Sequence, residues 1–269
     1  MQNQIRVIYE DKNFLAVYKP AGLLVHPVKI SNLKSQISKI IKEQTLTDWL
    51  VKNYPEVRKV GDEPEIRPGI VHRLDKDTSG VILIPRNQKY FEYLKNLFEA
   101  RQIKKTYLAL VYGKVEPRRG TIKKPIYLKP GTTKRTVWQG KMEKEAITEY
   151  KVLKYFIKTR INTDKNTDKH RYNISINPRS NPYKSATFSL LKVIPKTGRT
   201  HQIRVHLASI QHPIVGDSLY GPKINPFGLK RLFLHAESLE FSPSNGKRIK
   251  IESELPDELK SILKKLTNK

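Results

Sequence analysis

Short apolar runs, separated by polar stretches that contain glycine or proline, recur along the whole chain. Most of these runs are rich in Val, Ile, Leu, Tyr and Phe, which is typical of β-strands. In residues 81–84 every position is apolar, and this predicts a buried strand. The predicted strands cover residues 5–9, 14–18, 80–85, 105–113, 146–156, 186–194, 232–241 and 248–252.

Apolar positions at helical spacing predict four helices. Thr45 or Thr47 can cap the first helix and Asn87 the second, because their side-chain oxygens accept hydrogen bonds from N–H groups at a helix start. Pro256, followed by two acidic residues, marks the start of the last helix. The predicted helices cover about 46–54, 88–101, 201–210 and 256–267.

The predicted strands outnumber the helices and do not alternate with them. This order favours the α+β class, with a mixed, mostly antiparallel sheet and flanking helices. We expect a single domain over residues 1–269, with its core at about 5–240. Two polar stretches, at about 28–44 and 161–183, are expected to be insertions in loop conformation.

The composition adds a strong positive charge to this picture. The chain has 52 basic and 25 acidic residues, which gives a formal net charge of +27. Such an excess rarely serves folding, because like charges oppose compaction, and it suits a polyanionic partner such as nucleic acid. An anionic membrane surface and a general bias towards lysine are the alternative explanations.

Several features are missing from the sequence. It has no cysteine, which excludes disulfides, thiol nucleophiles and cysteine-based zinc sites. Its first residues show no apolar signal segment, and no run approaches the ~18 apolar residues of a membrane span. We therefore expect a cytoplasmic protein.

Three polar clusters carry the candidate chemistry. The first ends directly at the apolar run 81–84, where ionisable side chains are costly to keep unless they are hydrogen-bonded or functional. Asp75, Thr78 and Ser79 in this cluster are typical of a hydrogen-bonded turn, yet Asp75 is equally a candidate catalytic carboxylate. Tyr107 lies in a predicted strand, and a tyrosine in a strand is more often a packing residue than a functional one. The clusters are residues 72–80, 105–107 and 196–206.

The cluster 196–206 predicts an anion-binding helix start. Thr200 stands where an N-cap is expected, and exposed N–H groups at a helix start favour anions. Arg199 and Arg204 add fixed positive charge. His201 and His206 are weak candidates for metal ligands, because no third ligand stands at a diagnostic spacing.

Two of these clusters match known sequence motifs. Residues 72–80 fit the pattern His-Arg-Leu-Asp-x-x-Thr-Ser-Gly, and residues 198–206 read Gly-Arg-Thr-His-Gln-Ile-Arg-Val-His. Together with residues 14–22 and 212–221, they resemble the pseudouridine synthases of the RluA family. The resemblance covers about residues 5–240, nearly the whole chain.

The resemblance implies a catalytic domain with a central RNA-binding cleft that isomerises uridine to pseudouridine within RNA, without cofactor or metal. Asp75 corresponds to the catalytic aspartate and Tyr107 to the active-site tyrosine. Arg204 corresponds to the basic residue that pairs with the aspartate. The expected substrate-binding residues are Arg73, which helps to hold the place of the flipped-out nucleotide, His72, Arg199 and His201.

These residue types fit the chemistry. Uracil has to leave C1′ of the ribose, rotate and rejoin through C5. An ionised Asp75 can attack C1′ or remove the 2′ proton, and the sequence favours neither; both roles need an unprotonated carboxylate, which a nearby Arg204 favours. Tyr107 can stack on the uracil and later help to remove the C5 proton. The target base must leave its stack, which favours loops and weak pairs.

One departure from the family concerns the choice of RNA. Many members begin with a small S4-type RNA-binding domain, whereas here the catalytic pattern starts by residue 5. We expect a monomer whose catalytic domain selects a ribosomal or transfer RNA itself, with the stretches 28–44 and 161–183 as candidates for that role. The alternatives are a non-catalytic RNA-binding or RNA-folding protein on the same fold, and a basic metal-dependent nuclease, for which the sequence lacks a carboxylate and histidine ligand cluster.

Overall fold

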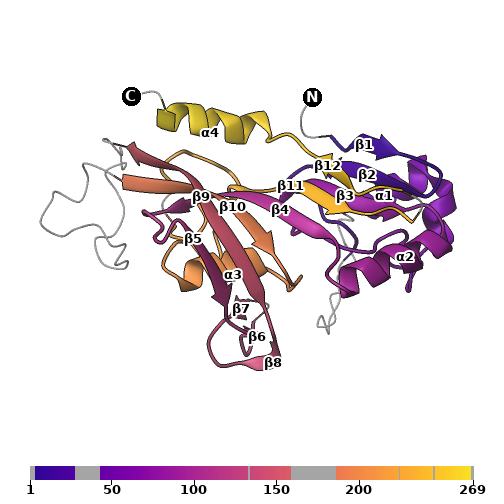
Figure 1. Ribbon diagram of the computed structural model, residues 1–269, viewed down its shortest axis with the longest axis horizontal. Helices are drawn as coiled ribbons and strands as arrows, with labels where there is room; N and C mark the ends of the chain where they lie inside the picture. Colours follow the sequence, from indigo (N-terminus) through magenta and orange to yellow (C-terminus); the bar gives the residue numbers. More distant parts are fainter. Residues whose placement is uncertain are drawn as a thin grey trace, which may run out of the picture. The chain divides into compact units, whose positions relative to one another are not determined.

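The computed structural model consists of two compact units, which we describe separately (Figure 1). It describes residues 4–27, 43–132, 134–158, 186–223, 225–244 and 246–267. The first unit comprises residues 1–103 and 238–253, and the second comprises residues 104–237 and 254–269. The polar stretch expected at 161–183 lies outside the described residues, as does 28–44 except for its last two positions.

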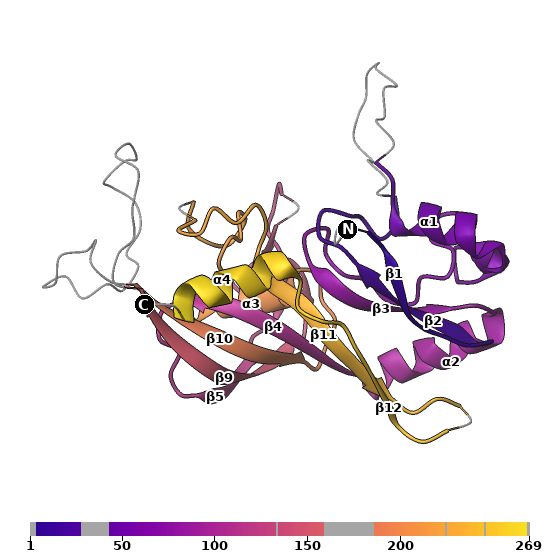
Figure 2. The same ribbon diagram turned by 90° about the horizontal axis from the view of Figure 1, so that it is seen from above.

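The first unit is a sheet with helices on either side (Figure 2). Strand β1 pairs with β2, and β2 pairs with β3, both in antiparallel register. The end of β11 pairs with β12 in the same sense. The elements of this unit are β1 (Arg6–Glu10), β2 (Phe14–Lys19), α1 (Leu46–Asn53), the short 3₁₀ helix η1 (Pro55–Lys59), β3 (Ser79–Pro85), α2 (Gln88–Glu99), the end of β11 (Leu234–Phe241) and β12 (Ile249–Glu252).

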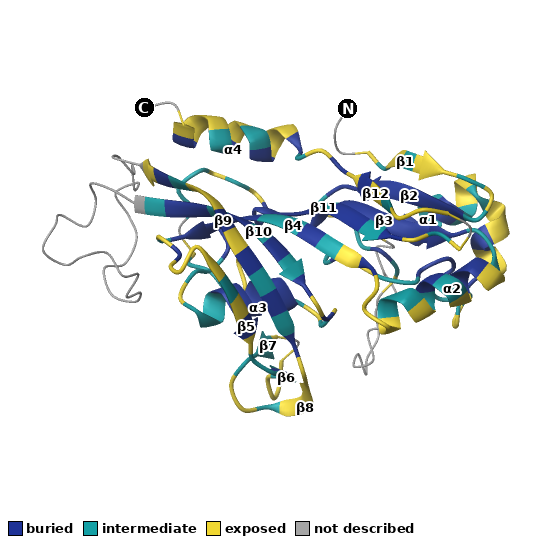
Figure 3. Ribbon diagram, viewed as in Figure 1, coloured by how far each residue is buried: buried dark blue, intermediate teal, exposed yellow. Residues whose placement is uncertain are grey.

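Strands β2 and β3 are buried along their whole length (Figure 3). Successive side chains of a strand point to opposite faces, so an uninterrupted apolar run needs cover on both. Helix α2 covers one face and α1 the other. The face towards α2 carries Phe14, Ala16, Val81 and Leu83, and the face towards α1 carries Leu15, Val17, Ile82 and Ile84.

Side-chain caps begin both α-helices of this unit, α1 and α2. The Thr45 hydroxyl accepts a hydrogen bond from the Asp48 N–H, while the Asp48 carboxylate accepts one from the Thr45 N–H, so the two residues form a capping box. Thr47, the alternative cap, lies inside α1. Asn87 caps α2, because its side-chain oxygen accepts a hydrogen bond from the Tyr90 N–H at 2.9 Å.

The second unit is built on an antiparallel sheet with the strand order β4–β10–β9–β5. Strand β11 contributes its first residues, 234–237, to this unit. Its other elements are β4 (Lys104–Tyr112), β5 (Arg119–Lys123), β9 (Ile147–Lys158), β10 (Ala186–Pro195), α3 (Gln202–Ser209) and α4 (Asp257–Thr267).

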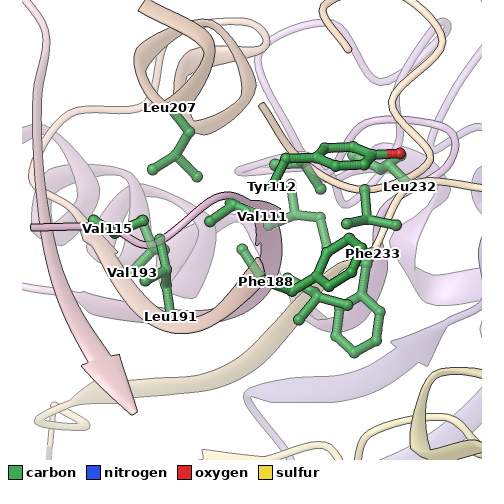
Figure 4. Packing of buried hydrophobic residues seen from close by; sticks show 14 of the residues in the cluster. Val111, Tyr112, Val115, Phe188, Leu191, Val193, Leu207, Leu232 and Phe233 are labelled. Atoms are coloured by element: carbon green, nitrogen blue, oxygen red, sulfur yellow. The ribbon is translucent and has the colours of Figure 1, made fainter. Parts of the chain in front are cut away.

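One apolar cluster forms the core of the second unit (Figure 4). Val111 of β4, Phe188 and Val193 of β10 and Leu207 of α3 are fully buried in it. Helix α4 adds Leu259 and its apolar neighbours one turn apart to the same cluster. The two helices therefore attach to the sheet through a shared core.

The residues between β5 and β9, which the sequence analysis left unassigned, form a small separate sheet. Its strands are β6 (Ile126–Leu128), β7 (Arg135–Thr136) and β8 (Lys141–Lys144), in the order β7–β6–β8. The pairing is antiparallel, with Tyr127 opposite Thr136. Strand β8 of this sheet is exposed, β7 is half-buried, and Ile126 of β6 is buried.

The elements confirm the predicted α+β class, because the strand pairs described above are antiparallel and the described residues also form four α-helices. In the described part of the chain, every helix is too short or too polar to cross a membrane. The same residues contain no group of three or more His, Cys, Asp or Glu arranged to hold a metal ion.

Candidate active site

Asp75 lies in a turn that is fastened to the end of β2. The Thr78 N–H donates a hydrogen bond to the Asp75 carbonyl at 3.1 Å, which closes the turn. The next carbonyl, that of Lys76, accepts hydrogen bonds from the Gly22 N–H and from the Lys19 ammonium, both at 2.9 Å. The backbone beside Asp75 is therefore held in place, while its side chain is only half-buried.

Lys19 is the buried centre of this fastening. Its ammonium is fully buried and donates hydrogen bonds to the carbonyls of Pro20 at 2.7 Å, Leu23 at 2.8 Å and Lys76. A buried cation is tolerated only when such groups replace its hydration. Lys19 directly follows the predicted strand 14–18, and its sequence neighbourhood did not indicate this role.

His72 anchors the start of the same segment to β3. Its Nε2 accepts a hydrogen bond from the Leu83 N–H at 2.8 Å, so the ring is neutral with its proton on Nδ1. The ring also lies 4.6 Å from that of Phe98, between centroids. These contacts give His72 a structural role beside its expected one in substrate binding.

Arg73 is exposed, and its Nη1 lies 3.0 Å from Nε2 of His26. The other ring nitrogen of His26 lies 2.9 Å from the Pro27 carbonyl, which can only accept a hydrogen bond. Nδ1 therefore carries the proton, and Nε2 accepts from Arg73. Burial lowers the pKa of His26, and the charges of Arg73 and Arg67 lower it further. A neutral His26 thus orients the arginine.

Tyr107 and Arg204 belong to the second unit. Tyr107 lies on β4 opposite Val193 and packs, half-buried, against the core of the unit. Arg204 lies on α3 and is buried, although it carries a permanent charge. The predicted pairing of Arg204 with Asp75 links the two units and stays a prediction.

Asp217 is the buried partner that the structure assigns to Arg204. Nε of Arg204 donates to one carboxylate oxygen at 2.7 Å, and Nη2 donates to the other at 2.8 Å. The side chain of Arg204 is 7% exposed and that of Asp217 is 0% exposed. The guanidinium carbon also lies 5.2 Å from the ring centroid of Tyr220. This bidentate pair fixes the orientation of the guanidinium.

The turn that contains Asp217 is tightly constrained. Its carboxylate also accepts hydrogen bonds from the N–H groups of Leu219 at 3.0 Å and Tyr220 at 3.2 Å. The preceding Gly216 has a φ of +78°, and a Cβ there would stand 2.1 Å from the Arg231 carbonyl oxygen. Asp217 was noted in the sequence only as part of a matching segment. It could have been found by asking which carboxylate pairs with Arg204, because a buried arginine needs such a partner.

Tyr220 connects this pair to His201. The Tyr220 hydroxyl accepts a hydrogen bond from the Arg135 N–H and lies 2.9 Å from Nδ1 of His201. His201 has a φ of +56° and is itself the N-cap of α3, without a side-chain cap bond. The expectation that Thr200 is the N-cap was therefore wrong. The side chain of Gln202, the first residue of α3, accepts a hydrogen bond from the Arg199 N–H at 3.0 Å and so holds the backbone that leads into the helix.

Arg199 and His206 of this cluster make local contacts. Nε of Arg199 donates to the Glu145 carbonyl at 3.0 Å, which ties the arginine to the start of β9. His206 is fully buried between the Thr148 hydroxyl and the Lys124 carbonyl, each at 2.9 Å. Burial lowers the pKa of His206, so it is neutral. It is a packing residue.

Each unit carries functional groups that are held in place. The first presents a half-buried carboxylate on a fastened turn, with Arg73 beside it in the sequence. The second presents a phenol on β4 and a guanidinium fixed by Asp217. Nucleophilic attack on a sugar, or removal of a proton from a sugar or a base, requires groups of this kind: a carboxylate, a phenol and a cation.

The sequence profile of a known family, described as RNA pseudouridylate synthase, matches residues 13–209. A protein of Aquifex aeolicus named as an uncharacterised RNA pseudouridine synthase is 36% identical over 96% of this chain and 72% of its own length. The ribosomal large subunit pseudouridine synthase D of Borreliella burgdorferi is 32% identical over 94% of this chain, which spans 65% of that protein. The protein of that name from Nitrosomonas europaea is 34% identical over 98% of this chain, which spans 66% of that protein.

Solved structures show the same fold. Human RNA pseudouridylate synthase domain containing 1 superimposes with a TM-score of 0.66 at 22% identity, covering 100% of this chain and 97% of its own. Human RNA pseudouridylate synthase domain containing 4 gives a TM-score of 0.64 at 23% identity, and the match covers 97% of this chain and 92% of that structure's chain.

Proposed function

The chain belongs to the RNA pseudouridylate synthase family, and from this premise we propose that it isomerises specific uridines in a structured RNA to pseudouridine, with Asp75 as the catalytic carboxylate. The observation that carries the assignment of Asp75 is its turn. The buried Lys19 fixes the neighbouring carbonyl, while the carboxylate itself is half-buried. A reactive group on a rigid support suits catalysis, because little reorganisation is needed when the substrate binds.

The other residues have roles that follow from their chemistry. Asp75, when ionised, acts at C1′ or at the 2′ proton of the ribose. Tyr107 stacks on the uracil and helps to remove the C5 proton. Arg204 supplies the positive charge that pairs with the aspartate. Its bidentate bond to Asp217 supports this role by setting the direction of the guanidinium.

Four residues are proposed to hold the RNA. Arg73, oriented by His26, occupies the place of the flipped-out nucleotide. His72, Arg199 and His201 complete the set, with His72 and Arg199 also serving the structure around them. Extrusion of the base takes a few kcal/mol, so an unpaired or weakly paired uridine is the favoured target.

Ribosomal RNA is the better supported of the two RNA classes, because two relatives are named as synthases of the large ribosomal subunit. Transfer RNA is the second candidate. The net charge of +27 supports binding to either. We propose that the protein works in the cytoplasm as a monomer, without cofactor or metal.

The test is the substitution Asp75→Asn, which removes the charge and keeps the shape. We expect pseudouridine formation to be abolished while RNA binding is retained. RNA from cells that lack the protein is incubated with the purified wild type or variant, and pseudouridines are mapped along it. Asp77→Asn is a matched control in the same turn and should retain activity.

Two outcomes would contradict the proposal. Retained activity in Asp75→Asn would exclude this carboxylate from catalysis. Wild-type protein that binds RNA but adds no pseudouridine to any RNA from the depleted cells would favour the alternative, a non-catalytic RNA-binding protein on the same fold.

A further inference from the structure

The small sheet β7–β6–β8 carries an exposed tryptophan. Trp138 is 72% exposed and lies in the turn between β7 and β8. A single exposed apolar residue needs no explanation in itself. Trp138 is different because its surroundings hold the ring in place and are strongly basic, as the following contacts show.

The turn around Trp138 is tightly built. The Trp138 N–H donates to the Thr136 hydroxyl at 3.0 Å. Gly140 lies so close to β6 that a Cβ there would stand 2.7 Å from the Leu128 carbonyl oxygen. The backbone on both sides of the tryptophan is thus fixed against its own sheet. The side chain has to project from the turn.

A fixed cation lies beside the ring. The ammonium of Lys124 is 5.8 Å from the Trp138 ring centroid, within the range of a cation–π contact. This ammonium also donates to the Ser209 carbonyl at 3.2 Å, and the Lys124 carbonyl accepts a hydrogen bond from His206 at 2.9 Å. Lys124 is therefore anchored to α3, and it orients the tryptophan in advance of any ligand.

The charge of this segment is almost entirely positive. Residues 123–144 contain seven basic residues and one acidic residue, Glu143. Glu143 is engaged by the Tyr127 hydroxyl, whose pKa is raised first by burial and then by this hydrogen bond. The basic residues are Lys123, Lys124, Lys129, Lys134, Arg135, Lys141 and Lys144.

We propose that the sheet β7–β6–β8 is an RNA-binding surface on which Trp138 stacks on an unpaired base, while the lysines contact the flanking phosphates. An aromatic face within a basic groove is the combination that single-stranded nucleic acid requires. A base within a duplex has no free face, so the occupant is an unpaired nucleotide. The inference rests on the proposed function, because it concerns how the same enzyme holds its RNA.

The test uses the fluorescence of Trp138. The chain has two tryptophans, so Trp49→Phe leaves Trp138 as the only reporter. We expect a single-stranded uridine oligomer to quench this fluorescence, because stacked bases quench indole, and a fully paired RNA duplex to quench it far less. Unchanged fluorescence at a saturating concentration of the oligomer would overturn the proposal.

Substitutions of Trp138 complete the test. Trp138→Ala should weaken binding of the oligomer about 5- to 150-fold, which is the range measured for stacking on one base. Trp138→Phe keeps an aromatic face and should recover most of the loss. Heparin, a polyanion without bases, should bind the wild type and Trp138→Ala alike. An equal loss for heparin and the oligomer would refute stacking.

This test is separate from that of the catalytic assignment. Asp75→Asn should still show quenching of Trp138. If that variant retains isomerase activity while the quenching persists, the catalytic assignment fails and the binding surface stands. If the variant loses activity but the oligomer does not quench the fluorescence of Trp138, the catalytic assignment stands and the binding surface fails.

Discussion

The pair of Arg204 and Asp217 shows how one residue can depend on another that the sequence hardly marks. Both side chains are buried, and the pair is bidentate. Burial of two charges is costly, and such pairs are retained where they fix an orientation. The carboxylate also holds the backbone of the following turn. Asp217 is therefore a positioning residue for Arg204.

Asp217→Asn should destabilise the protein strongly. The amide cannot neutralise Arg204, and an uncompensated buried charge typically costs about 3–5 kcal/mol of the free energy of unfolding. Urea denaturation of both proteins measures this difference. As a control, Glu254→Gln breaks the exposed ion pair with Lys260 and should leave the free energy of unfolding unchanged.

A variant Asp217→Asn as stable as the wild type would show that the pair contributes nothing to stability.

The same argument affects how Arg204 is tested. Replacing Arg204 alone leaves Asp217 buried without its cation, so any loss of activity has to be compared with the loss of folded protein. Circular dichroism at the assay temperature makes that comparison.

Among the helices and strands, β3 and the helix after it show how local signals add up. The apolar run of β3 is covered on both faces, and α2 provides one of the covers. Asn87 starts α2 two residues after β3 ends, by accepting the Tyr90 N–H. The cap thereby helps to place the helix against the strand that follows the Asp75 turn.

Asn87→Ala should reduce the free energy of unfolding by about 1 kcal/mol, because the free N–H groups at the helix start lose their acceptor. The midpoint of urea unfolding should fall while the m-value stays constant. Asn87→Asp restores a capping oxygen and should recover most of the loss. Equal midpoints for all three proteins would show that the cap is unimportant for stability.

For the protein as a whole, the charge is the dominant property. A net charge of +27 on 269 residues opposes compaction and favours a polyanion. Membership in a family that acts on RNA accounts for this charge.

RNA binding should depend steeply on salt. If six to ten phosphates are neutralised, the affinity falls by about 10³- to 10⁵-fold between roughly 50 and 200 mM salt. Filter binding over this range gives the slope of log affinity against log salt. Trp138→Ala, which removes no charge, should keep the slope of the wild type. An affinity independent of salt would contradict a phosphate-based interaction.

Much of the fold could be predicted because its signals are local. The apolar runs of β2 and β3 and the spacing of α4 are properties of neighbouring residues, and the structure confirms them. The motifs at 72–80 and 198–206 likewise indicated the family, which the comparisons confirm. The start of α3 was misassigned, because His201 adopts a left-handed conformation, which is uncommon for residues other than glycine.

The local chemistry of the chain therefore determined its class, its family and its candidate carboxylate, since each depends on residues close together in the sequence. Only the tertiary structure paired Arg204 with Asp217, placed Lys19 beneath the Asp75 turn and set Lys124 beside Trp138. Lys76 is 57 residues from Lys19 along the chain, and Asp217 is 13 residues from Arg204. Such partners are selected by geometry and by the cost of a buried charge, which a pattern of neighbouring residues does not record.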